Sequence, residues 1–73
     1  MVNKKDSLAR EIKIARAVKG YTQGDLAQAS GVAKITIALL ESKKYKNMPS
    51  VDTVVKLALA LDLNKERLLK YLA

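Results

Sequence analysis

Residues 22–41 read TQGDLAQASGVAKITIALLE and contain two short helical patterns joined by a glycine. Ala27 supplies a small side chain where two helices can cross steeply, and Gly31 tolerates the positive φ that a tight turn between them requires. Ile37 and Leu40 are three residues apart, so they share one face of the second helix. This spacing predicts that the second helix packs on the protein through that face and leaves its opposite face exposed.

Three further helical patterns flank this segment. Apolar spacing and capping signals define them, and strand-like alternation does not occur over a useful length. The five predicted helices cover residues 7–19, 22–30, 33–42, 51–61 and 65–72. The sequence therefore predicts an all-α fold in a single domain spanning residues 1–73, with residues 1–6 as a flexible basic arm.

Charge and composition narrow the classes of function. The 73 residues include 14 Lys+Arg and 7 Asp+Glu, a formal net charge of +7. Such an excess on a small body favours a polyanionic partner, nucleic acid before an anionic membrane surface. Without Cys or His, the chain lacks the usual general base and the commonest zinc ligands. We therefore expect no enzyme, no metal or other cofactor and no small-molecule substrate.

Neither a secretory signal nor a membrane span is visible in the sequence. The first ten residues hold no apolar segment, and the longest unbroken apolar run, Leu57–Leu61, is far shorter than a bilayer requires. The sequence thus predicts a cytoplasmic protein that does not bind membranes.

Residues in the motif and on both of its flanks follow a known pattern. They are Ile12, Lys13, Arg16, Gly20, Thr22, Gln23, Leu26, Ala27, Gly31, Val32, Thr36, Ile37, Leu40, Glu41, Pro49, Ser50, Ala58, Ala60, Leu61 and Leu63. The pattern resembles the helix-turn-helix of the phage Cro and repressor proteins, also called the xenobiotic-response-element family of bacterial regulators. The resemblance covers about residues 8–70.

The resemblance implies a five-helix, lambda-repressor-like domain in which the second and third helices form the helix-turn-helix. In such proteins the third helix enters the major groove of double-stranded DNA, usually as a homodimer on a palindromic operator. The chain is therefore expected to be a small transcriptional repressor in the cytoplasm of a bacterial cell or a phage-infected host.

The outward face of the third helix and its surroundings are the expected DNA-binding site. The predicted contacts are Gln23, Ala33, Lys34, Ile35, Thr36, Leu39, Lys43, Lys44 and Lys46. Lys34 can donate to guanine O6 and N7, whereas Ile35 and Leu39 can pack on thymine methyl groups. By the resemblance, Gln23 and Thr36 contact the DNA backbone, and the three loop lysines clamp phosphates.

Ile35 and Leu39 leave alternatives open, because relatives commonly carry polar residues at such positions. The two side chains either contact thymine methyl groups, pack inside the protein or form a protein-binding patch. Together with Leu59 they motivate a second hypothesis, a protein-interaction module on the same fold, such as an antitoxin-like or antirepressor-like partner. The loop lysines also have a plain alternative, that of an ordinary solvated loop.

Two further predictions concern how the protein is held together. By the resemblance, Arg16 and Glu41 form a partly buried salt bridge that joins the first helix to the end of the third. The C-terminal apolar cluster either closes the core of one subunit or pairs two subunits, since a chain this small gains from added burial. The predicted dimer residues are Leu59, Leu68, Leu69, Tyr71 and Leu72.

Overall fold

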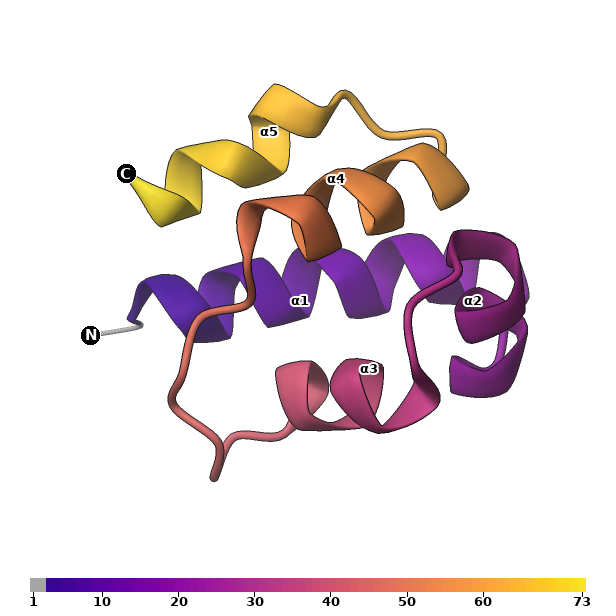
Figure 1. Cartoon of the computed structure of the whole chain (residues 1–73), viewed down its shortest axis with the longest axis horizontal. Helices are drawn as coiled ribbons and strands as arrows, with labels where there is room; N and C mark the ends of the chain where they lie inside the picture. The colour runs from indigo at the N-terminus through magenta and orange to yellow at the C-terminus, as the bar shows by residue number, and fades with distance from the viewer. Residues whose placement is uncertain (1–2) are drawn as a thin grey trace.

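The computed structural model describes residues 3–73, which form five α-helices and one short 3-10 helix (Figure 1). The elements are α1 (Lys4–Val18), α2 (Gln23–Ser30), α3 (Lys34–Glu41), α4 (Val51–Ala60), α5 (Lys65–Leu69) and the 3-10 helix η1 (Lys70–Leu72). No strand occurs in this described part of the chain. The all-α fold with five helices that the sequence predicts is confirmed.

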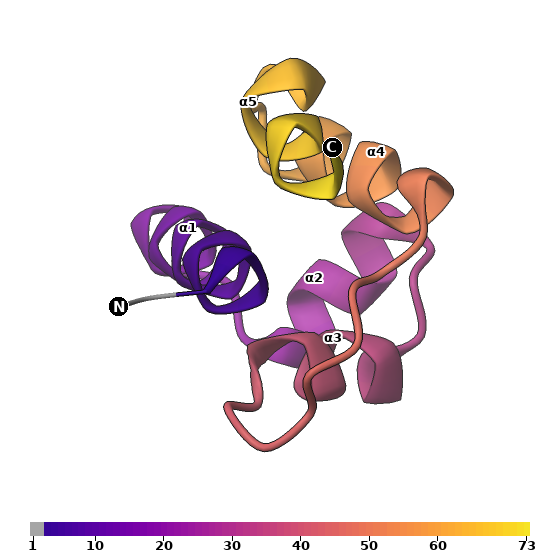
Figure 2. The same cartoon turned by 90° about the vertical axis from the view of Figure 1, so that its left-hand side faces the viewer.

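In Figure 1, α1 lies between α3 below and α4 and α5 above, and the turned view of Figure 2 shows that α1 forms one side of the molecule. α2 packs against both α3 and α4, and η1 packs against α1 and α5. The fully buried large side chains come from every α-helix, and they are Leu8, Ile12, Leu26, Ile37, Val54, Leu57 and Leu68. Burial of such side chains is the main force that holds the helices together.

α2 is specified by signals at both of its ends. At its start, the hydroxyl of Thr22 accepts a hydrogen bond from the amide of Asp25 at 3.0 Å, and the carboxylate of Asp25 accepts one from the amide of Thr22 at 2.9 Å. At its end, Gly31 adopts a left-handed φ of 76° and its amide donates to the carbonyl of Ala27. Thr22 and Asp25 thus form a capping box, and the predicted glycine turn is confirmed.

α1 begins three residues earlier than the sequence predicts. Asn3 caps it, since its Oδ1 accepts a hydrogen bond from the amide of Asp6 at 2.8 Å, and Lys5 in the first turn is buried. The prediction of a flexible arm is therefore wrong for residues 4–6, while residues 1–2 lie outside the described residues. The spacing of apolar residues did not predict this first turn of α1, because a capping asparagine and a buried lysine stabilise it.

α4 is buried along one face only. α4 buries Val54, Leu57 and Ala58, but Val51 and Leu59 are exposed, so the helix is not buried all round. Its buried residues follow the spacing of one face, because only one side of α4 meets the core. Among the described residues, none of the helices has the length and apolarity needed to cross a bilayer.

Candidate nucleic-acid interface

α3 turns one face to the core and the other to solvent. Ile37 and Leu40 are buried, whereas Lys34 is exposed, Ile35 is 65% exposed and Leu39 is 37% exposed. The side chains of Ile35 and Leu39 thus do not pack inside the protein, which removes one of the three alternatives. The open face combines an ammonium group with apolar side chains. The helix itself lies at the lower edge of the molecule in Figure 1.

The start of α3 leaves backbone donors uncovered by side chains. The N-cap residue, Ala33, makes no side-chain capping hydrogen bond, and its carbonyl accepts from the amides of Thr36 and Ile37 at 3.0 and 3.2 Å. The first amides of a helix have no carbonyl partner inside it, and the helix dipole makes this end positive. Ala33 and Lys34 are exposed and Thr36 is partly buried. This end of α3 therefore suits an electron-rich partner.

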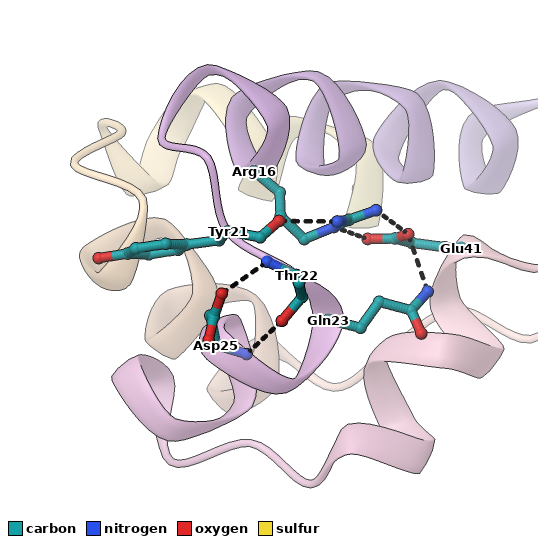
Figure 3. A network of polar contacts seen from close by, with 6 residues as sticks. All are labelled: Arg16, Tyr21, Thr22, Gln23, Asp25 and Glu41. Carbon is teal, nitrogen blue, oxygen red and sulfur yellow. Dashed lines mark hydrogen bonds and ion pairs between the residues drawn. The ribbon is translucent and has the colours of Figure 1, made fainter.

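A polar network holds the opposite end of α3 (Figure 3). The guanidinium of Arg16 donates to both carboxylate oxygens of Glu41 at 2.9 Å, and its third contact is the carbonyl of Tyr21, also at 2.9 Å. The side chains of Arg16 and Glu41 are 16% and 4% exposed. The salt bridge expected between these residues thus has a two-pronged geometry, and it joins α1 to the end of α3.

Gln23 belongs to the same network. Its Nε2 donates to Oε1 of Glu41 at 3.0 Å, and the side chain is partly buried at the start of α2 (Figure 3). The resemblance predicted a phosphate contact for Gln23 but not this bond to Glu41. An amide has two N–H donors and one carbonyl acceptor, so a single bond leaves capacity for a second partner. The network therefore fixes where the remaining polar groups of Gln23 lie.

Lys5 on α1 holds the last turn of α3 and the chain that follows. Its ammonium nitrogen donates to the carbonyls of Leu39 at 3.1 Å and Ser42 at 2.5 Å, and it lies 5.9 Å from the ring centroid of Tyr45. The residue is only 3% exposed, and this burial lowers the pKa of Lys5. Sequence reasoning missed Lys5 because it precedes the segment that resembles the family.

The basic loop after α3 lies at the same edge of the molecule as α3 (Figure 2). Lys43, Lys44 and Lys46 are all exposed, and none of them forms an ion pair within residues 3–73. The loop has few bonds of its own, and one of them runs from the amide of Lys44 to the hydroxyl of Ser42 at 3.3 Å. Three unpaired ammonium groups thus lie beside the open face of α3.

Arg10 and Lys13 extend this positive region onto α1. Both are exposed, and they line a hollow of about 360 Å³ between α1 and the end of α3. The other lining residues are Asp6, Ala9, Glu41, Ser42 and Lys43. Sequence reasoning assigned Arg10 and Lys13 no role, although their spacing of three places them on one side of the helix. Within the described chain, no group of acidic, His or Cys side chains could hold a metal ion.

The residues predicted to form a dimer interface differ in how far they are buried. Leu68 is fully buried in the hydrophobic core of the chain, which corrects the prediction that it contacts a second subunit. Leu69, Tyr71 and Leu72 are partly buried against the same core, and Leu59 on α4 is 69% exposed. The carboxylate of Glu11 accepts a hydrogen bond from the Tyr71 hydroxyl, and this bond raises the pKa of Tyr71.

An apolar hollow lies on another side of α1. It has a volume of about 480 Å³ and is lined by Ile14, Val18, Leu61, Leu63 and neighbouring residues. Ile14 and Val18 are 55% and 82% exposed. Sequence reasoning assigned Ile14 and Val18 no role, because they lie outside the apolar stripe that faces the core.

Comparison with known proteins identifies the region that contains these features. The helix-turn-helix family model, HTH_3, matches residues 12–68. The match includes α2 and α3 and extends into α1 and α5 on either side. No curated protein matches the sequence.

Proposed function

The chain belongs to the Cro/C1-type helix-turn-helix family HTH_3, a family of DNA-binding transcription regulators, and from this premise we propose that it is a small repressor. In this proposal two copies bind a palindromic operator in the cytoplasm of a bacterial cell or phage-infected host. The observation that carries the proposal is the open face of α3, where Lys34, Ile35 and Leu39 lie exposed beside the basic loop.

The open face has the chemistry to read base edges in the major groove. Lys34 is in the first turn of α3, the part of a recognition helix that meets base edges. Its ammonium group donates to O6 and N7 of guanine, while Ile35 and Leu39 pack on the methyl groups of thymine. Because the two apolar side chains have no hydrogen-bonding group, the proposed half-site combines guanine with neighbouring thymines.

The proposed phosphate contacts surround this face. Lys43, Lys44 and Lys46 supply three exposed ammonium groups on one side of α3, and Gln23 supplies an amide anchored by Glu41 on another. Each neutralised phosphate releases counterions, so binding should weaken steeply with salt. Thr36 and Ala33 complete the proposed contact set.

The proposed dimer uses the side of the molecule formed by α4, α5 and η1. Leu59 offers an exposed apolar side chain there, and Leu69, Tyr71 and Leu72 are partly buried residues of the C-terminal segment. Two subunits related by a two-fold axis would read half-sites about 34 Å apart, one turn of B-DNA.

A second candidate is a protein-interaction module, antitoxin-like or antirepressor-like. The exposures of Ile35 and Leu59, 65% and 69%, favour it, because exposed apolar groups commonly mark protein interfaces. The apolar hollow beside Ile14 and Val18 offers such a partner a further surface.

Selection of duplexes from a random pool at physiological salt distinguishes the two candidates. An enriched palindrome with half-sites about one helical turn apart supports the repressor proposal. If the protein enriches no duplex and instead forms a stable stoichiometric complex with another protein, the interaction module is the better proposal.

Substitution of Lys34 tests the proposed base contact. Lys34→Ala should weaken binding to the selected operator about tenfold or more, with little change on unrelated duplexes. As the matched comparison, Lys44→Ala should weaken binding to all duplexes alike and reduce the slope of log K against log salt by about one. Fluorescence anisotropy at several salt concentrations measures both. Unchanged operator affinity in Lys34→Ala would show that Lys34 does not read a base.

A further inference from the structure

One ammonium group connects α1 to the last turn of α3 and to the basic loop. Nζ of Lys5 donates to the carbonyl of Leu39, inside α3, and to the carbonyl of Ser42, the residue that begins the loop. The ring of Tyr45, in the middle of the loop, lies 5.9 Å from the same nitrogen. A cation suits this place, because the C-terminal end of a helix is negative and an aromatic face attracts positive charge.

The side-chain bonds within the loop are longer than the bond that Lys5 makes to Ser42. Its internal side-chain bonds are long, from the amide of Lys44 to the hydroxyl of Ser42 at 3.3 Å and from Asn47 to the hydroxyl of Tyr45 at 3.4 Å. Lys5, by contrast, is buried, and its bond to the Ser42 carbonyl measures 2.5 Å. The charged groups beside Lys5 are Asp6 on its own helix and Lys46 on the loop.

We propose that Lys5 is a positioning residue for DNA binding, which holds the loop so that Lys43, Lys44 and Lys46 face the phosphates beside the major groove. Lys5 itself is too buried to contact DNA. Its effect therefore passes through Ser42 and Tyr45 to the three exposed lysines. This inference rests on the proposed function and adds to it a residue from the start of α1.

Holding both carbonyls at once needs a compact group with several N–H donors. An ammonium group has three N–H donors, which serve the two carbonyls, whereas a methionine of similar length has none. Lys5→Met would leave both carbonyls without this partner at a partly buried place. Lys5→Arg keeps the charge and the donors, although its planar head is larger.

The experiment compares Lys5→Met and Lys5→Arg with Lys65→Met, which removes one exposed lysine at the start of α5. We expect Lys5→Met to lower affinity for the selected operator about tenfold more than Lys65→Met does, because several phosphate contacts weaken together. Lys5→Arg should recover part of the loss. The amide spectrum of residues 42–48 should change in Lys5→Met and stay as in the wild type in Lys65→Met.

A measurement on the wild type covers the case in which Lys5→Met fails to fold. Backbone order parameters of residues 43–46 should be about 0.8, close to those of the helices, if the loop is held. Values below about 0.6 would overturn the proposal. Equal operator affinity of Lys5→Met and Lys65→Met would overturn it as well, and leave the proposed function intact. If the wild type selects no duplex, the proposed function fails and this inference fails with it.

Discussion

The two helices of the motif, α2 and α3, have eight residues each but are held in opposite ways. α2 is closed at both ends by its own neighbours, Thr22 and Asp25 at the start and Gly31 at the end. α3 starts at Ala33 without a side-chain cap, and its far end is held by residues from α1 and α2.

This difference separates a helix that is determined locally from one that is placed by the rest of the protein. Capping within three residues marks the start of α2 from its own sequence. The orientation of α3 depends instead on its buried face and on Arg16, Gln23 and Lys5. The attachments of α3 lie at its far end and on its buried face. Its start and outer face are therefore free for the proposed DNA contacts.

The largest expected effect comes from cutting the contact of α3 with the core. Ile37 is fully buried, so Ile37→Ala should lower the free energy of unfolding by about 3 to 4 kcal/mol. Ile35→Ala, on the outer face of the same helix, should change it by less than about 0.5 kcal/mol. Urea unfolding followed by circular dichroism measures both. Equal losses would mean that α3 does not have one attached and one open face.

Breaking the network at the end of α3 should have the next largest effect. Arg16→Met leaves the carboxylate of Glu41, which is 4% exposed, with Gln23 as its remaining side-chain partner. We expect a loss of about 2 kcal/mol, less than for a fully buried pair because Arg16 is partly exposed. The double variant Arg16→Met/Glu41→Leu should lose less than the single one, since no uncompensated charge remains. Thermal and urea unfolding test this order. A double variant that is as unstable as Arg16→Met, or less stable, would contradict it.

The capping pair of α2 should give the smallest effect, and one that depends on pH. The hydrogen bond from the Thr22 amide lowers the pKa of Asp25 below its ordinary value of 3.8. A carboxylate with a lowered folded-state pKa stabilises the protein above its ordinary pKa, and this contribution is lost as the pH falls through the folded-state value. The stability difference between the wild type and Asp25→Ala should therefore be largest near neutral pH and shrink below about pH 4. Parallel pH profiles of unfolding would contradict this assignment.

Local signals in the sequence were sufficient for much of the fold. Thr22, Asp25 and Gly31 lie within a few residues of the helix ends that they define, so the limits of α2 could be predicted from their spacing. The three-residue interval between Ile37 and Leu40 likewise predicted which face of α3 is buried. Prediction was possible here because the interacting residues are neighbours along the chain.

Contacts between distant residues could not be predicted in the same way. Lys5 lies 34 residues from Leu39 and 37 from Ser42, and no local pattern distinguishes it from a solvated lysine. The bond between Gln23 and Glu41 spans 18 residues and depends on how α2 and α3 cross. The position of Leu68 in the sequence does not distinguish a buried leucine from an exposed one. Only the packing of α5 shows that it is buried.

The turn at Gly31 has a consequence for which amino acids position 31 can accept. A β-carbon added there would meet no atom within 4 Å, so space does not exclude alanine or serine. The restriction lies in the backbone, whose φ of 76° disfavours most L-residues but is tolerated by asparagine and aspartate. A library randomised at this codon should consequently return Gly first and Asn or Asp next, an order set by torsional preference and not by side-chain size.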